Sequence, residues 1–125
     1  MRKTVLIVDD NTFIRHALYE VFNREADFEV CGVAENGREA IEAAGRLHPD
    51  LIVLDLSMPV MNGLEAARIL KQTMPSIQLI MYSAFGDGFS AQKAGFSGIS
   101  ELVSKSERVS VLIAKARGLL NPKAA

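Results

Sequence analysis

The sequence predicts an α/β domain in which a parallel β-sheet carries helices on both faces. Three observations lead to this prediction. Short apolar runs recur along the chain, segments with helical periodicity lie between them, and the length of 125 residues suits one domain of ordinary size. Hydrophobic residues make up 49% of the chain, which is enough for a substantial core. We therefore expect a single domain over residues 1–125.

Four apolar runs are expected to form strands, and a weaker signal marks a fifth strand. The four runs are Val5–Val8, Val30–Ala34, Leu51–Leu54 and Leu79–Met81. The first, third and fourth runs are continuous rather than alternating, which is typical of strands that are covered on both faces in a parallel sheet. The fifth strand is expected within Ser97–Lys105, centred on Leu102 and Val103.

Helices are expected after the first, second, third and fifth strands. The first helix is expected over residues 11–25, and its apolar residues share one face: Phe13, Ile14, Ala17, Leu18, Val21 and Phe22. Asn36 and Asn62 each precede a glutamate by three residues, a spacing that caps the starts of the second and third helices. The last helix is expected from about Glu107 to Leu120, with Val109, Leu112, Ile113, Ala116 and Leu120 facing inward.

Residues 85–98 follow the local rules poorly, although the topology requires a helix there. This segment holds four of the nine glycines and three of the six phenylalanines. Because an interior glycine costs a helix about 1 kcal/mol relative to alanine, we expect a short or mobile helix near residues 89–96. Exposed phenylalanines in this segment would form an apolar patch that marks a partner or dimer surface.

Composition and charge exclude several functional classes. Lys and Arg number 14 and Asp and Glu number 15, so the net charge of −1 argues against nucleic-acid binding by this domain. The single cysteine, Cys31, excludes a disulfide framework and a cysteine-rich zinc site. The sequence contains no apolar run long enough to cross a bilayer, and we expect no signal peptide because Met1–Lys3 leads into only a short apolar stretch. We expect a cytoplasmic protein with no membrane partner.

Polar side chains follow four of the predicted strands. Asp9 and Asp10 follow the first strand, Asp55 follows the third, Ser83 ends the fourth and Lys105 follows the fifth. In an open α/β sheet, ligands bind beyond the carboxyl ends of the strands, so these residues are expected to converge on one edge.

The predicted cluster is suited to phosphoryl transfer. Clustered carboxylates repel one another, and a hard divalent cation such as Mg²⁺ relieves this repulsion. An aspartate can then act as a nucleophile towards phosphorus and form an aspartyl phosphate. A lysine and a serine hydroxyl can stabilise the phosphoryl oxygens.

Several motifs carry a family resemblance. They are VLIVDDN at 5–11, AENGREAIEAA at 34–44, PDLIVLDLSMPVMNGLEAARIL at 49–70, the pair Ser83-Ala84, and Ser104-Lys105-Ser106. Together they extend over essentially the whole chain, and they resemble the receiver domain of bacterial two-component response regulators. The resemblance implies a flavodoxin-like sheet of five strands in the order 2-1-3-4-5.

The resemblance also implies a role for each residue of the cluster. Asp55 would accept the phosphoryl group, and Ser83 and Lys105 would contact it. The implied Mg²⁺ ligands are Asp9, Asp10, Asp55 and the backbone carbonyl of Ser57. Pro59 and Gly63 would shape the loop after Asp55.

The resemblance further implies a signalling switch in a phosphorelay. The phosphate donor would be a phosphohistidine on a sensor histidine kinase or a phosphotransfer protein. Phosphorylation would change the protein contacts of the 85–104 surface towards a downstream target that the sequence does not identify. Such a chain is not a classical enzyme, because it catalyses only its own phosphorylation and dephosphorylation. The chain would act as a stand-alone receiver or as a piece of a longer regulator.

The sequence departs from the family pattern near its fifth strand. Leu102 stands where many members carry a tyrosine or phenylalanine, and Ser106 replaces a common proline. A leucine can repack but cannot swing a ring between buried and exposed positions. These departures leave the switching mechanism open, whereas the residues of the acidic cluster are all present.

Two other functions remain as alternatives. One is a degenerate receiver that binds partners independently of phosphorylation, which the unusual segment 85–104 favours and the complete acidic cluster opposes. The other is a small hydrolase with an aspartyl-phosphate intermediate, as in haloacid-dehalogenase-like phosphatases. Those enzymes carry a second aspartate two residues after the nucleophile on the first strand, and Asp9 lacks this partner. Nucleotide binding is disfavoured because the chain has neither a G-x-G-x-x-G nor a Walker A motif.

Overall fold

The five predicted strands form one parallel sheet of order β2-β1-β3-β4-β5 in the computed structural model, which describes residues 2–84 and 98–121. The strands are β1 Lys3–Val8, β2 Phe28–Ala34, β3 Leu51–Leu54, β4 Gln78–Ser83 and β5 Glu101–Ser104. All four neighbouring pairs are parallel. The predicted fold class and strand order are therefore confirmed.

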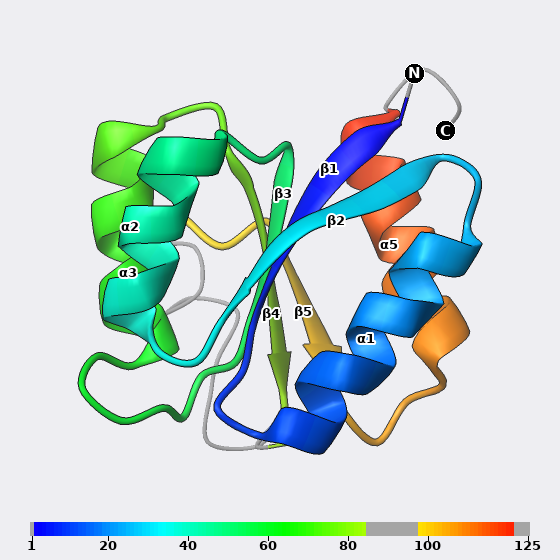
Figure 1. Cartoon of the computed structure of the whole chain (residues 1–125), viewed down its shortest axis with the longest axis horizontal. Helices are drawn as coiled ribbons and strands as arrows, with labels where there is room; N and C mark the ends of the chain where they lie inside the picture. The colour runs from blue at the N-terminus through cyan, green and yellow to red at the C-terminus, as the bar shows by residue number, and fades with distance from the viewer. Residues whose placement is uncertain (1, 85–97, 122–125) are drawn as a thin grey trace.

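Helices cover both faces of the sheet, as predicted (Figure 1). The helices are α1 Thr12–Arg24, α2 Gly37–Leu47, α3 Gly63–Thr73 and α5 Val109–Leu120. In Figure 1, α2 and α3 lie on one side of the sheet, and α1 and α5 lie on the other. The helix expected near residues 89–96 lies outside the described residues. Among the described helices, none has the length and apolar character needed to span a membrane.

Three asparagines cap the starts of helices. The side chain of Asn11 accepts hydrogen bonds from the first turn of α1, and the Asn36 side chain accepts one from the backbone N–H of Glu39. Asn62 and Glu65 form a complete capping box, in which each side chain accepts from the other residue's backbone N–H. Each cap satisfies N–H groups that a helix start leaves without partners. The caps at Asn36 and Asn62 are those that the sequence predicts, whereas the cap at Asn11 was not predicted.

The core consists of two layers that the sheet separates. The layer beneath α2 and α3 contains alternate residues of the central strands, including Leu6, Val8, Ile52, Leu54, Leu79 and Met81. The layer beneath α1 and α5 contains the intervening residues, including Val5, Ile7, Leu51, Val53, Ile80 and Tyr82. Because both faces of these strands are buried, their sequences are continuous apolar runs rather than alternating ones.

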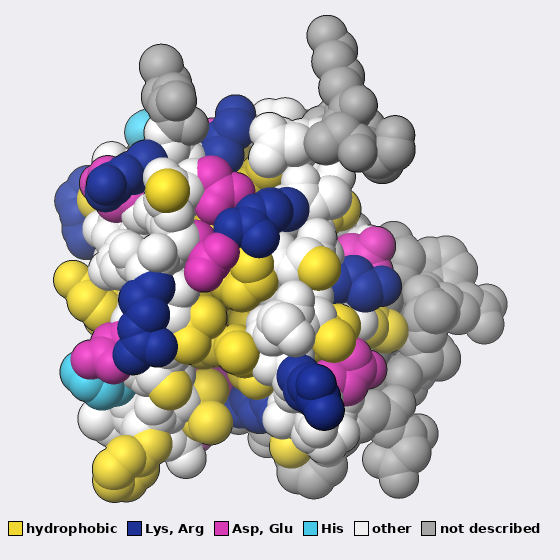
Figure 2. Space-filling model, turned by 90° about the vertical axis from the view of Figure 1, so that its right-hand side faces the viewer, with side chains coloured by type: hydrophobic (Ala, Val, Ile, Leu, Met, Phe, Trp, Pro, Cys, Tyr) yellow, Lys and Arg dark blue, Asp and Glu magenta, His cyan; other side chains and the backbone are white. Residues whose placement is uncertain are grey.

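The predicted inward face of α1 is partly wrong. Phe13 is 86% exposed and Ala17 is also exposed, whereas Leu18 and Phe22 are buried. The buried stripe of α1 is narrower than the apolar face that the helical periodicity predicts. Phe13 and Ala17 form a neighbouring row that faces solvent. Val109, the first residue of α5, is likewise 38% exposed. Figure 2 shows the side of α1 and α5, where hydrophobic side chains lie among charged ones.

Candidate functional site

Three carboxylates meet at the carboxyl ends of β1 and β3. Asp9 and Asp10 follow β1, and Asp55 follows β3. One ligand oxygen from each of them lies within 4.8 Å of the others. Asp9 and Asp55 are buried, whereas Asp10 is exposed. The structure thus brings the three acidic residues together, with one side of the cluster open to solvent.

The turn between β1 and α1 fixes the orientation of Asp9. Its backbone N–H donates to the carbonyl of Ala34, with an N···O distance of 3.1 Å. Its Oδ1 accepts a 2.9 Å hydrogen bond from the backbone N–H of Asn11. Its Oδ2 lies 2.8 Å from the Nζ atom of Lys105. Both oxygens of this carboxylate are therefore engaged by the protein.

Lys105 is the cation that faces the carboxylates, as the sequence predicts. The backbone N–H of Lys105 donates to the carbonyl of Ser83 (2.9 Å), which extends the pairing of β5 with β4 to the edge of the sheet. Its Nζ atom lies 3.4 Å from Asp55 Oδ1, in addition to the contact with Asp9. Burial acts to lower the pKa of Lys105, but the hydrogen bond to Asp9 and the charge of Asp55 outweigh it and raise that pKa. The ammonium group therefore stays charged at neutral pH.

Asp55 lies in an environment that disfavours its negative charge. Its backbone N–H donates to the carbonyl of Val8 (2.9 Å), which places it at the end of β3. Burial raises the pKa of Asp55, and the nearby charge of Asp9 raises it further, while Lys105 opposes both effects. Among the described residues, Lys105 is the cation that contacts the carboxylates of Asp9 and Asp55. One positive charge does not balance three carboxylates, so the cluster favours an additional cation.

Ser83 and Ser57 occupy different positions relative to this cluster. Ser83 is the last residue of β4, is buried, and lies at the same edge of the sheet because β4 pairs with both β3 and β5. Ser57 is exposed in the loop that follows β3.

The start of α3 packs directly against the backbone of Asp55. The backbone N–H of Gly63 donates to the carbonyl of Leu56 (2.9 Å). A Cβ atom at position 63 would lie 2.2 Å from the carbonyl oxygen of Asp55, so only glycine fits there. This contact closes the loop between Asp55 and α3 and gives a physical reason for the glycine.

Arg15 was not identified from the sequence as a residue of this region. Its Nη1 atom donates to the carbonyl of Asp9 (2.8 Å), and its side chain is only 14% exposed. The helix dipole disfavours a positive charge in the first turns of a helix. An arginine at this position therefore indicates that its side chain is stabilised by a partner outside the helix.

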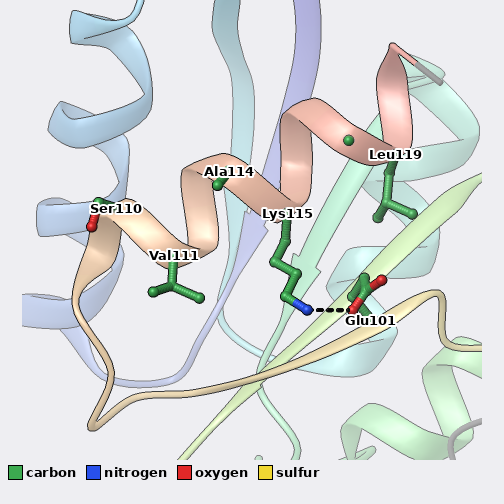
Figure 3. A pocket seen from close by; sticks show the side chains of 7 residues that line it. Glu101, Ser110, Val111, Ala114, Lys115 and Leu119 are labelled. Atoms are coloured by element: carbon green, nitrogen blue, oxygen red, sulfur yellow. Dashed lines mark hydrogen bonds and ion pairs between the residues drawn. The ribbon is translucent and has the colours of Figure 1, made fainter. Parts of the chain in front are cut away.

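A groove outside the acidic cluster lies along β5 and α5 (Figure 3). The Lys115 side chain from α5 points towards Glu101 of β5, and their Nζ and Oε1 atoms are 3.1 Å apart. None of the residues that line the groove belongs to the acidic cluster.

Comparisons with known proteins identify relatives with the same fold. The family model described as response regulator receiver domain matches residues 5–117. The chain is 38% identical over 105 residues to the chemotaxis protein CheY of Thermotoga maritima, covering 84% of this chain and 87% of that protein. The crystal structure of the response regulator domain of Thermotoga maritima CheB superimposes with a TM-score of 0.89 and 30% identity, covering 97% of this chain and 98% of that one.

A further relative is a longer protein. The chain is 45% identical over 87 residues to the protein-glutamate methylesterase/protein-glutamine glutaminase 1 of Vibrio vulnificus. The match covers 70% of this chain but only 23% of that protein. The similarity therefore concerns a part of that relative.

Proposed function

The chain belongs to the response regulator receiver domains of two-component signalling, and on this premise we propose that Asp55 accepts the phosphoryl group. Receiver domains are phospho-acceptor switches, and the family assignment does not favour a phosphorylation-independent binding module or a hydrolase. The observation that supports Asp55 is its position: a buried carboxylate at the end of β3, with Lys105 Nζ 3.4 Å away and two further aspartates beside it.

We propose that Mg²⁺ binds to Asp9, Asp10 and Asp55, with the backbone carbonyl of Ser57 as a further ligand. The three carboxylates offer hard oxygen donors within 4.8 Å of one another, which is the ligand chemistry that Mg²⁺ prefers. The raised pKa of Asp55 is further support, because burial and the charge of Asp9 both disfavour its negative charge, and a bound cation would offset both effects. When bound, the ion would neutralise negative charge on the phosphoryl oxygens.

In the proposed reaction, a carboxylate oxygen of Asp55 attacks the phosphorus of a phosphohistidine. A P–O bond forms while the P–N bond breaks, and the imidazole nitrogen that leaves keeps the electron pair and takes up a proton. The ammonium group of Lys105 donates to one phosphoryl oxygen, and the hydroxyl of Ser83 donates to another. Because the pKa of Lys105 is raised, this cation is present throughout the neutral range.

The proposed phosphate donor is a sensor histidine kinase or a phosphotransfer protein, and the proposed receiver of the signal is another protein or domain. Since relatives are named as protein-glutamate methylesterases, a methylesterase domain is one candidate for the output. We propose that phosphorylation changes the protein contacts of the 85–104 surface. In the described part of that surface, Leu102 is half-buried and packs against the core beneath α2 and α3. A change at Leu102 would therefore occur by repacking.

Phosphorylation by acetyl phosphate tests the assignment of Asp55. We expect acetyl phosphate and Mg²⁺ to add one phosphoryl group to the chain, visible as a single mass increase. Asp55→Asn is expected to abolish this increase because the amide is not a nucleophile of comparable strength. Glu42→Gln, which neutralises an exposed carboxylate on α2, serves as the matched control and should be labelled like the wild type. Undiminished labelling of Asp55→Asn would refute the assignment.

A further inference from the structure

Arg15 connects three segments next to the acidic cluster. Its Nη1 atom donates to the carbonyl of Asp9 at the end of β1 (2.8 Å). Its Nη2 atom lies 3.4 Å from Thr12 Oγ1 at the start of α1 and 3.4 Å from Glu35 Oε1 after β2. One guanidinium group thus bridges the β1–α1 turn and the segment between β2 and α2.

The contact with Asp9 bears directly on the geometry of the carboxylates. The Asp9 carbonyl immediately precedes Asp10, so its direction determines where the Asp10 backbone begins. The Asp9 side chain is held by Asn11 and Lys105, while Asp10 is exposed and lies two residues beyond the end of β1. We propose that Arg15 is a positioning residue that holds the β1–α1 turn so that Asp9 and Asp10 face Asp55 for Mg²⁺ binding and phosphorylation.

Planar donors are needed for this role. A guanidinium group presents several N–H donors in fixed directions, so it reaches the Asp9 carbonyl and Glu35 at the same time. A lysine at this position carries a compact ammonium group without these fixed donor directions, so we expect it to hold the two partners less well. Because the Arg15 side chain is 14% exposed, water replaces its hydrogen bond to the carbonyl poorly.

This inference rests on the proposed function, and its test therefore includes a readout that does not depend on phosphorylation. The variant Arg15→Gln is compared with Arg15→Lys and with two controls. Glu35→Gln removes the ionic part of the contact but keeps an acceptor oxygen for the guanidinium and leaves the donation to Asp9. Arg24→Gln removes an exposed arginine of α1 that pairs with Glu20 at 3.4 Å. All variants are first compared with the wild type by thermal unfolding.

The first measurement is the Mg²⁺ concentration that gives half-maximal labelling by acetyl phosphate. We expect it to rise about tenfold in Arg15→Gln, to be partly restored in Arg15→Lys, and to change less than about twofold in both controls. If the wild type is labelled and Arg15→Gln has the same Mg²⁺ requirement, the inference is overturned and the proposed function stays intact. A variant that is merely less stable, with the same Mg²⁺ requirement, shows a structural role only.

The second measurement is the amide hydrogen exchange of Asn11, whose N–H donates to Asp9 Oδ1 at 2.9 Å. Without Mg²⁺ or phosphate, this amide should exchange about tenfold faster in Arg15→Gln than in the wild type, and at the wild-type rate in Glu35→Gln. If the wild type takes no label at all, the proposed function fails. The exchange of Asn11 then still decides whether Arg15 holds the turn, and equal rates in Arg15→Gln and wild type reject the inference.

Discussion

Replacing Gly63 with alanine should destabilise the protein, because its position is in contact with the backbone of Asp55. The added Cβ atom would lie 2.2 Å from the Asp55 carbonyl oxygen, whereas real Cβ contacts are essentially never shorter than 3.0 Å. The two segments must therefore separate by about 0.8 Å, the difference between those distances. The displaced atoms are backbone on both sides, so no side chain can rotate to relieve the contact.

The expected magnitude combines two opposing effects. Overpacking costs about 3 kcal/mol when the backbone must shift, and replacing glycine by alanine in a helix returns about 1 kcal/mol. Gly63→Ala should therefore lower the free energy of unfolding by about 2 kcal/mol. Gly45→Ala is the matched control, because Gly45 also lies in a helix but has nothing within 4 Å of the added atom. It should raise the free energy of unfolding by about 0.5–1 kcal/mol.

Urea unfolding followed by far-UV circular dichroism measures both variants against the wild type. The same variants are then labelled with acetyl phosphate, where Gly63→Ala should react more slowly because the displaced backbone carries Asp55. If Gly63→Ala is as stable as Gly45→Ala, α3 does not pack as closely against the Asp55 carbonyl as the 2.2 Å separation requires.

Three further predictions concern charge and backbone strain. Because burial and the charge of Asp9 raise the pKa of Asp55, ionising this carboxyl group destabilises the fold as the pH rises through that raised value. Asp55→Asn should thus raise the melting temperature at neutral pH without divalent cations, and the gain should shrink in acid; a pH-independent gain would contradict this. Val60 has a φ of 69° and is 75% exposed, so Val60→Asn should raise the free energy of unfolding by about 1 kcal/mol in urea titrations. Arg117→Gln removes the ion pair with Asp27, whose atoms are 2.7 Å apart. Because both side chains are partly exposed, this change should lower the free energy of unfolding by about 1 kcal/mol at low salt and by less at high salt. An equal loss at both salt concentrations would contradict this prediction.

The predictability of each strand depended on its place in the sheet. β3 has the predicted bounds, because Leu51–Leu54 is central and buried throughout and Asp55 follows it directly. β2 begins at Phe28 rather than Val30, since it is an edge strand whose exposed Glu29 interrupts the apolar pattern. β5 is short and half-exposed, which is why its signal in the sequence was weak.

The convergence of the candidate site could be predicted, whereas its finer contacts could not. Parallel strands end at the same edge, so residues such as Asp55 and Lys105 had to lie near each other once the strands were recognised. The contact of Arg15 with the Asp9 carbonyl and that of Gly63 with the Asp55 carbonyl depend on how α1 and α3 pack at their first turns. The spacing of residues along the chain does not specify these packing distances.

Mapping the phosphorylated residue is the most direct test that Asp55 accepts the phosphoryl group. The protein is incubated with acetyl phosphate and Mg²⁺ and then reduced with borohydride, which converts an aspartyl phosphate to homoserine, and its peptides are sequenced by mass spectrometry. We expect homoserine at position 55, with Asp9 and Asp10 unchanged. Homoserine at position 9 or 10 with Asp55 intact, or the absence of any reduced aspartate in a protein that has gained phosphate, would contradict it.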